Sequence, residues 1–164
     1  MRAGPVRAGP MTGRNLVVGY GNPLRGDDGL GWYAAAALAA DPGPADTDVL
    51  TRHQLTPELA EDIATARLAV LIDASLGDTP GCVSLREVAP AAGPSWSHHL
   101  RPEDVVGLAH ALFGAAPQVL LVTVTGAHFG YSTQLSPAVS DCMSRVVALV
   151  EAALLSSPTD LRSR

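Results

Sequence analysis

Residues 15–31 read NLVVGYGNPLRGDDGLG. The first six are apolar and rich in β-branched side chains, which indicates a buried β-strand. The next nine contain glycine, proline, asparagine and two adjacent aspartates, Asp27 and Asp28, and this composition predicts a loop. Residues 29–40 are rich in alanine and leucine and stop before an Asp-Pro pair, so we expect a helix there. The chain therefore opens with a strand, a loop and a helix.

The same order of elements repeats along the rest of the chain. We expect further strands at residues 47–52, 68–74, 82–88 and 119–125, and helices at about 57–66, 102–113 and 136–155. Strands that alternate with helices predict the α/β class: a three-layer, mostly parallel twisted sheet with helices on both faces. In such sheets, ligands bind beyond the carboxyl ends of the strands.

Length and composition favour one domain. The chain has 164 residues, of which 47% are hydrophobic, enough for a single core. We expect this domain to span residues 15–155. Residues 1–14, in which the tetrapeptide RAGP occurs twice, are expected to be a disordered extension, and residues 156–164 a frayed tail.

The charge and the cysteines argue against several classes of protein. Eleven basic against 16 acidic residues give a net charge of −5, the wrong sign for general attraction to nucleic acid. No apolar run is long enough for a membrane span or a signal peptide, so we expect a cytoplasmic protein. We also expect a monomer. Cys82 and Cys142 lie far apart and indicate neither a disulfide scaffold nor a zinc ribbon.

The loop at residues 19–31 fits no nucleotide-binding motif. Leu24 stands where G-x-G-x-x-G needs its third glycine, and Asp27 stands where a P-loop needs lysine. Two aspartates before a helix would also repel a phosphate. One of them could cap the helix, but a cap needs only one carboxylate, so Asp28 is also a candidate for chemistry.

Two further segments bring polar groups toward the same edge of the expected sheet. Asp73 ends the apolar strand LAVLIDA, and a buried carboxylate needs a hydrogen-bond donor, a metal or water. His98 and His99 lie just before the helix expected at 102–113. Two carboxylates and one imidazole suit a divalent ion such as nickel, zinc or manganese, and three protein ligands leave positions open for substrate.

These segments carry a family resemblance. The loop GYGNPLRGDDGLG, the strand LIDAS and the segment SHHLRPEDVV resemble, in the same order, three motif regions of the nickel-iron hydrogenase maturation proteases. The late segment TVTGAHFGYSTQLSPAV is similar to the family's last strand and the helix that follows it. The resemblance implies that Asp28, Asp73 and His98 are the metal ligands and catalytic residues. His98 is preferred to His99 because residues 98–106 then align without a gap.

The resemblance also implies a function. Such an endopeptidase removes the C-terminal extension of the hydrogenase large-subunit precursor after nickel insertion, and the nickel comes with the precursor, so the resting protein should be largely metal-free. Whether the metal activates water or an aspartate acts as general base stays open. Two other functions also stay open: a hydrolase that keeps its own metal and acts on another substrate, and a nickel-dependent chaperone of the large subunit that does not cleave.

Overall fold

A computed structural model describes residues 13–40, 46–93, 99–114 and 116–156. Its centre is a five-stranded sheet in the order β2-β1-β3-β5-β4. All neighbouring strands run parallel except β4, which pairs antiparallel with β5 at one edge. The strands are β1 (Asn15–Tyr20), β2 (Thr47–Arg52), β3 (Leu68–Ser75), β4 (Val83–Glu87) and β5 (Gln118–Thr125). The predicted mostly parallel sheet is confirmed.

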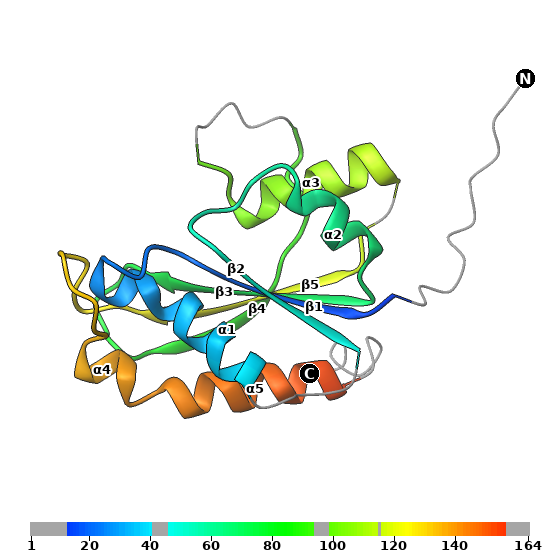
Figure 1. The fold of residues 1–164 in the computed structure, drawn as a ribbon. Coiled ribbons are helices and arrows are strands. Elements are labelled where there is room, and N and C mark those ends of the chain that lie inside the picture. Colours follow the sequence, from blue (N-terminus) through cyan, green and yellow to red (C-terminus); the bar gives the residue numbers. More distant parts are fainter. Residues whose placement is uncertain (1–12, 41–45, 94–98, 115, 157–164) are drawn as a thin grey trace, which may run out of the picture.

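Helices cover both faces of the sheet, as predicted (Figure 1). One face packs against α2 (Leu59–Thr65) and α3 (Pro102–Phe113). The other packs against α1 (Leu30–Ala40), α4 (Pro137–Ser140) and α5 (Met143–Leu155). In β1, Leu16, Val18 and Tyr20 point to the first face and Val17 to the second, the alternation of a strand buried on both sides.

The topology places a crevice at the carboxyl ends of β1 and β3. From β1 the chain first moves to β2 on one side and then returns to β3 on the other. Neighbouring connections diverge at such a switch point, and ligands of α/β sheets bind there. The loop after β1 contains a short 3-10 helix, η1 (Gly26–Gly29), which leads directly into α1. Asp28 is on η1 and Asp73 is near the end of β3, so the fold brings both to this crevice.

The last predicted helix differs from the prediction, because it is two helices rather than one. The amide of Cys142 bonds to the carbonyl of Val139, three residues back, and the cysteine thiol donates to the same oxygen. The helical ladder is therefore interrupted between α4 and α5.

The ends of the chain lie mostly outside the described residues. Residues 1–12 of the expected N-terminal extension and residues 157–164 of the expected tail belong to the segments that are not described. Arg14 pairs with Asp48 at 2.9 Å, and its carbonyl accepts a hydrogen bond from the amide of Arg67. None of the described helices has the length and apolar character of a membrane-spanning segment.

Candidate functional site

Asp73 lies on the face of the sheet that α2 and α3 cover. Along β3, Ala69 and Leu71 pack into that face, and the two-residue period of a strand brings Asp73 to the same side. Tyr20 ends the neighbouring strand on the same side, and its hydroxyl donates a hydrogen bond to the Asp73 carboxylate. The amide of Ala74 donates a second, 2.8 Å from Oδ1. This partly buried carboxylate thus has two donors from its own sheet.

The surroundings of Asp73 favour its neutral form. Burial is the main cause that raises its pKa, to about 7, and the nearby charge of Asp28 acts in the same direction. The hydrogen bonds from Tyr20 and Ala74 offset part of this effect. Burial and the charge of Asp73 in turn raise the pKa of Tyr20 well above its usual range, so Tyr20 stays a donor. Asp73 can therefore gain or lose a proton near neutral pH, and binding of a cation would displace its proton to water.

Asp28 is half-buried on η1. Its Oδ2 accepts a hydrogen bond of 2.9 Å from the amide of Asn22, so its carboxylate reaches back across the loop rather than forward to the helix. Gly21 makes room for this turn: its φ is +128°, and a Cβ there would lie 1.9 Å from the carbonyl oxygen of Asp28. The loop therefore holds Asp28 close enough to Asp73 for their charges to interact.

Asp27 has a different position from its neighbour, because its side chain is fully buried. It accepts hydrogen bonds from the amides of Ala127, His128 and Ser136, at 2.7, 2.9 and 2.7 Å, and from the Ser136 hydroxyl at 2.8 Å. Burial alone would raise the pKa of Asp27, but these four donors outweigh it and lower the pKa below its usual value. Asp27 thus joins the loop after β1 to the loop after β5.

The structure therefore brings together two of the three predicted site residues, Asp28 and Asp73. His98 lies outside the described residues, so its position relative to them stays a prediction. His99 is described and exposed. Within the described ranges, no group of three or more histidine, cysteine, aspartate or glutamate side chains is placed to hold a metal ion.

Sequence reasoning missed Tyr20. A tyrosine at the end of an apolar strand is indistinguishable from a core residue in the sequence, and its partner is 53 positions away. The available signal was register: β1 and β3 pair in parallel with Gly19 opposite Ile72, so the next residues, Tyr20 and Asp73, are neighbours. A polar atom on Tyr20 beside a buried carboxylate could have been inferred from that pairing.

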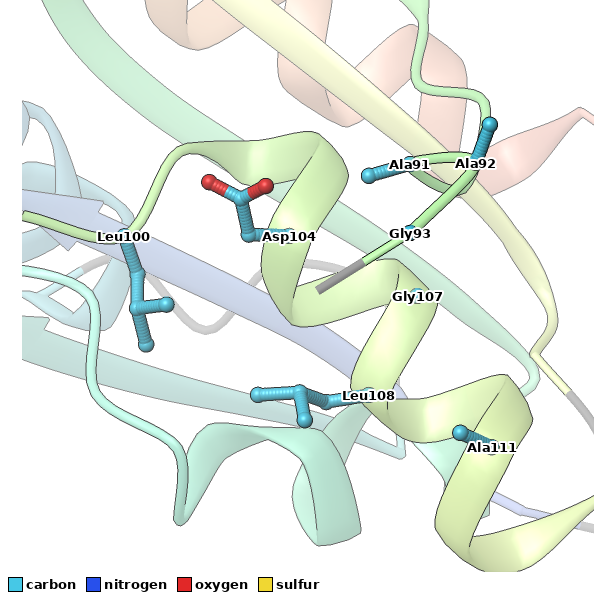
Figure 2. A pocket seen from close by; sticks show the side chains of 8 residues that line it. All are labelled: Ala91, Ala92, Gly93, Leu100, Asp104, Gly107, Leu108 and Ala111. Carbon is cyan, nitrogen blue, oxygen red and sulfur yellow. The ribbon is translucent and has the colours of Figure 1, made fainter. Parts of the chain in front are cut away.

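A separate hollow lies beside α3 and contains neither Asp28 nor Asp73 (Figure 2). Its volume is about 390 Å³, and small or apolar residues form most of its wall: Ala91, Ala92, Gly93, Leu100, Gly107, Leu108 and Ala111. The carboxylate of Asp104, which also lines it, is bonded to the backbone and side chain of Arg101. The described residues that line the hollow therefore offer mainly apolar contact, and the carboxylate among them is already hydrogen-bonded.

Comparison with known proteins gives matches among solved structures. No family model matches the chain, and no curated protein is similar enough to match. The hydrogenase maturating endopeptidase HybD from E. coli superposes with a TM-score of 0.68 and 24% identity, over 86% of this chain and 91% of that one. The hydrogenase maturation protease HycI from Thermococcus kodakarensis gives 0.69 and 21%, over 87% and 93%. A solution structure of an endopeptidase from Escherichia coli gives 0.69 and 25%, over 86% and 91%.

These matches span nearly the whole described chain and nearly the whole of each neighbour, so they concern the complete domain and not a shared fragment. They agree with the five-stranded sheet and its helical layers. The chain has the fold of the hydrogenase maturation endopeptidases, as the resemblance in its sequence implied.

Proposed function

We propose that this protein is an endopeptidase that removes the C-terminal extension of a nickel-iron hydrogenase large-subunit precursor after nickel has been inserted. The observation that carries the proposal is the meeting of Asp28 and Asp73 at the β1/β3 crevice of this fold. Two of the structural neighbours are named as hydrogenase maturation proteases or endopeptidases and a third as an endopeptidase, which supports a peptidase. We also propose that it acts in the cytoplasm as a monomer.

The two carboxylates suit a cation that arrives with the substrate. Asp28 and Asp73 repel each other when both are charged, and a divalent ion between them would remove that repulsion. Carboxylate oxygens bind hard and borderline metal ions such as Ni²⁺. The pair would leave other coordination positions of the ion open, so nickel that the precursor already holds could also be bound by Asp28 and Asp73. This is the behaviour required of a protease that recognises its substrate through the metal.

His98 is the proposed third ligand. It is four residues before Pro102, where α3 begins, and four residues of extended chain span at most about 14 Å. The start of α3 is close to the pair formed by Tyr20 and Asp73, because the charge of Glu103 in its first turn acts on Tyr20. The short separation in sequence between His98 and the start of α3 therefore supports the assignment from the sequence.

The residues of the chain can also contribute to the cleavage step. The pKa of Asp73 is raised to about 7 without a cation, and a cation nearby would favour the charged carboxylate, which is the form that can accept a proton. We propose that Asp73 accepts a proton from the attacking water while Tyr20 fixes the direction of its carboxylate. Nickel held by the precursor and by Asp28 would position the scissile bond, so that part of the rate comes from proximity.

The test is incubation of the protein with its nickel-loaded precursor, followed by intact mass. We expect loss of a C-terminal peptide with the nickel-loaded precursor and not with the nickel-free one. Asp28→Asn should abolish cleavage, since the amide has nearly the same shape but no charge. The matched control is Asp78→Asn, an exposed aspartate on the loop after β3, which should cleave normally.

Two further variants separate the adjacent histidines. His98→Ala should abolish nickel-dependent cleavage, whereas His99→Ala should leave at least half of the rate. Cleavage of the nickel-free precursor, or an intact nickel-loaded precursor with a folded wild-type protein, would contradict the proposed function. Tight metal retained through purification would instead indicate the hydrolase of another substrate.

A further inference from the structure

Three large apolar side chains are exposed at the carboxyl edge of the sheet. Leu24, on the loop after β1, is 48% exposed; Leu76, after β3, is 84% exposed; and Tyr131, after β5, is 86% exposed. Because β1, β3 and β5 are parallel, their following loops meet at one end of the molecule, opposite the end where β1 begins (Figure 1). Exposed apolar side chains gathered in one place mark contact surfaces for other molecules.

Backbone hydrogen bonds hold these loops together. The amide of Ser132 donates to the carbonyl of Leu24 at 3.1 Å, and the amide of Gly26 donates back to Ser132 at 2.8 Å. The amide of Gly126, at the start of the loop that carries Tyr131, donates to the carbonyl of Ser75 at 2.9 Å. The three loops thus form a preordered surface, and a surface of this kind loses little conformational entropy when a partner covers it.

The segments that carry Leu24 and Leu76 also carry the acidic residues of the site. Asp28 follows Leu24 by four residues, and Asp73 precedes Leu76 by three. A partner surface that complements these residues would be apolar and would carry a positive charge opposite the two carboxylates. A second copy of this chain would place carboxylates against carboxylates, and a membrane with anionic headgroups would be repelled in the same way. A polypeptide surface around a bound metal cation fits both properties.

We propose that Leu24, Leu76 and Tyr131 form a docking rim for the nickel-bearing face of the hydrogenase precursor. The inference rests on the proposed function and adds to it the surface by which the substrate is held. The rim supplies binding energy at a distance from the scissile bond, and Asp28 and Asp73, on the same segments of the chain, receive the cation. Apolar and aromatic anchors around a polar centre are the common source of binding energy in such contacts.

The test compares two double variants of the full-length protein. Leu76→Ser with Tyr131→Ser removes two members of the rim. The matched control, Leu112→Ser with Leu155→Ser, removes side chains that are 66% and 75% exposed at the C-terminal ends of α3 and α5. For each folded variant we would measure the Kd for the nickel-loaded precursor by calorimetry, and kcat and KM for its cleavage by intact mass.

We expect the rim variant to raise both Kd and KM at least tenfold with kcat within twofold of wild type, and the control to match wild type. Equal Kd values for the rim variant and the control would overturn the docking rim while leaving the protease assignment intact. If the wild-type protein bound the nickel-loaded precursor and did not cleave it, the proposed function would fail. The docking rim would still be tested by the Kd values of the rim variant and the control. Loss of self-association in the rim variant, with precursor binding unchanged, would assign the rim to a second copy and overturn the proposal.

Discussion

The hydroxyl of Tyr20 donates a hydrogen bond to the carboxylate of Asp73, across two parallel strands that end side by side. Both side chains are on the sheet face that α2 and α3 cover, where Tyr20 is buried and Asp73 is partly buried. A hydrogen bond to a charged group in such surroundings stabilises the charged form. Tyr20 therefore influences both where the Asp73 carboxylate points and how readily it ionises.

The first prediction concerns Tyr20→Phe. The change removes the donor, so the pKa of Asp73 should rise above its value of about 7. Loss of a hydrogen bond to a charged group should lower the free energy of unfolding by about 1.5–3 kcal/mol at pH 8, and by about 1 kcal/mol at pH 5, where Asp73 is neutral. Urea unfolding at the two pH values measures the difference.

Tyr33→Phe is the control for that variant. The Tyr33 hydroxyl donates to the carbonyl of Thr133 at 2.7 Å, and its ring is partly exposed. Removing it should cost under about 1.5 kcal/mol and should cost the same at both pH values. If Tyr20→Phe also lost the same stability at pH 5 and pH 8, the bond to Asp73 would not depend on charge as described.

The second prediction is a fall in stability between about pH 4 and pH 7. The folded protein holds the pKa of Asp73 at about 7, above the ordinary value of 3.8 that applies to the unfolded chain. In this window the folded state binds more protons than the unfolded state, so each rise of one pH unit costs up to about 1.4 kcal/mol. The free energy of unfolding, measured from urea curves at several pH values, should decline accordingly.

Asp73→Asn isolates the contribution of that one group. The variant cannot titrate at this position, so its stability should be flatter than that of the wild type from pH 4 to pH 7. At pH 8 it should be more stable than the wild type, because the wild type then holds a buried charge. A wild-type protein whose stability rises steadily from pH 4 to pH 8 would contradict the raised pKa.

The third prediction concerns Asp27→Asn. The carboxylate accepts four hydrogen bonds and donates none, whereas an amide must turn its NH2 toward some of the same donors. We expect a loss of about 3 kcal/mol at pH 7, since a buried acceptor of charge-assisted bonds is removed and its donors are left unpaired. The loop after β5 should also lose protection from hydrogen exchange at Ala127 and His128.

The matched control for Asp27→Asn is again Asp78→Asn. Asp78 is exposed on the loop after β3, and its replacement should change the free energy of unfolding by less than about 0.5 kcal/mol. The effect of Asp27→Asn should also shrink in acid. The folded protein lowers the pKa of Asp27, so its contribution to stability is present above the ordinary value of 3.8 and is lost as the pH falls further. If Asp27→Asn still lowered the free energy of unfolding by about 3 kcal/mol at a pH where Asp27 of the wild type is protonated, this charge effect would be contradicted.

Most of the fold could be predicted from the sequence because its signals are local. The run of β1, the breakers after Tyr20 and the proline at the start of α3 mark their own boundaries, and helix α3 begins and ends where it was predicted. The final helix was predicted as one element because its apolar spacing continues across Asp141 and Cys142. Only the bonding of Cys142 to Val139 shows the interruption.

The site was predictable in part. Asp73 could be found because it is a carboxylate near the end of an apolar strand, and Asp28 because a helix cap does not need two adjacent aspartates. The roles of Asp27 and Tyr20 could not, because both depend on partners from other elements: the amides of the loop after β5 for Asp27, and the carboxylate of β3 for Tyr20. Of the two adjacent aspartates, the sequence alone does not show that one is fully buried and the other only half-buried.

The last prediction is that Gly31→Ala disrupts both folding and activity. In an ordinary helix, this change gains up to about 1 kcal/mol. Here a Cβ would lie 2.5 Å from the amide nitrogen and the carbonyl oxygen of Tyr20 and from the carbonyl oxygen of Ile72. All three are backbone atoms of β1 and β3, so neither side can move without shifting the strands that carry the site. We expect a loss of at least about 3 kcal/mol, the upper end of the usual cost of overpacking.

Gly93→Ala provides the comparison, because a Cβ at Gly93 would meet nothing within 4 Å and its φ is not in the left-handed region. That variant should be neutral or slightly more stable, by up to about 1 kcal/mol. Urea unfolding measures both costs, and cleavage of the nickel-loaded precursor shows whether Asp28, three residues before Gly31, has been displaced. A Gly31→Ala protein as stable and as active as Gly93→Ala would mean that α1 does not approach β1 and β3 as closely as these distances require.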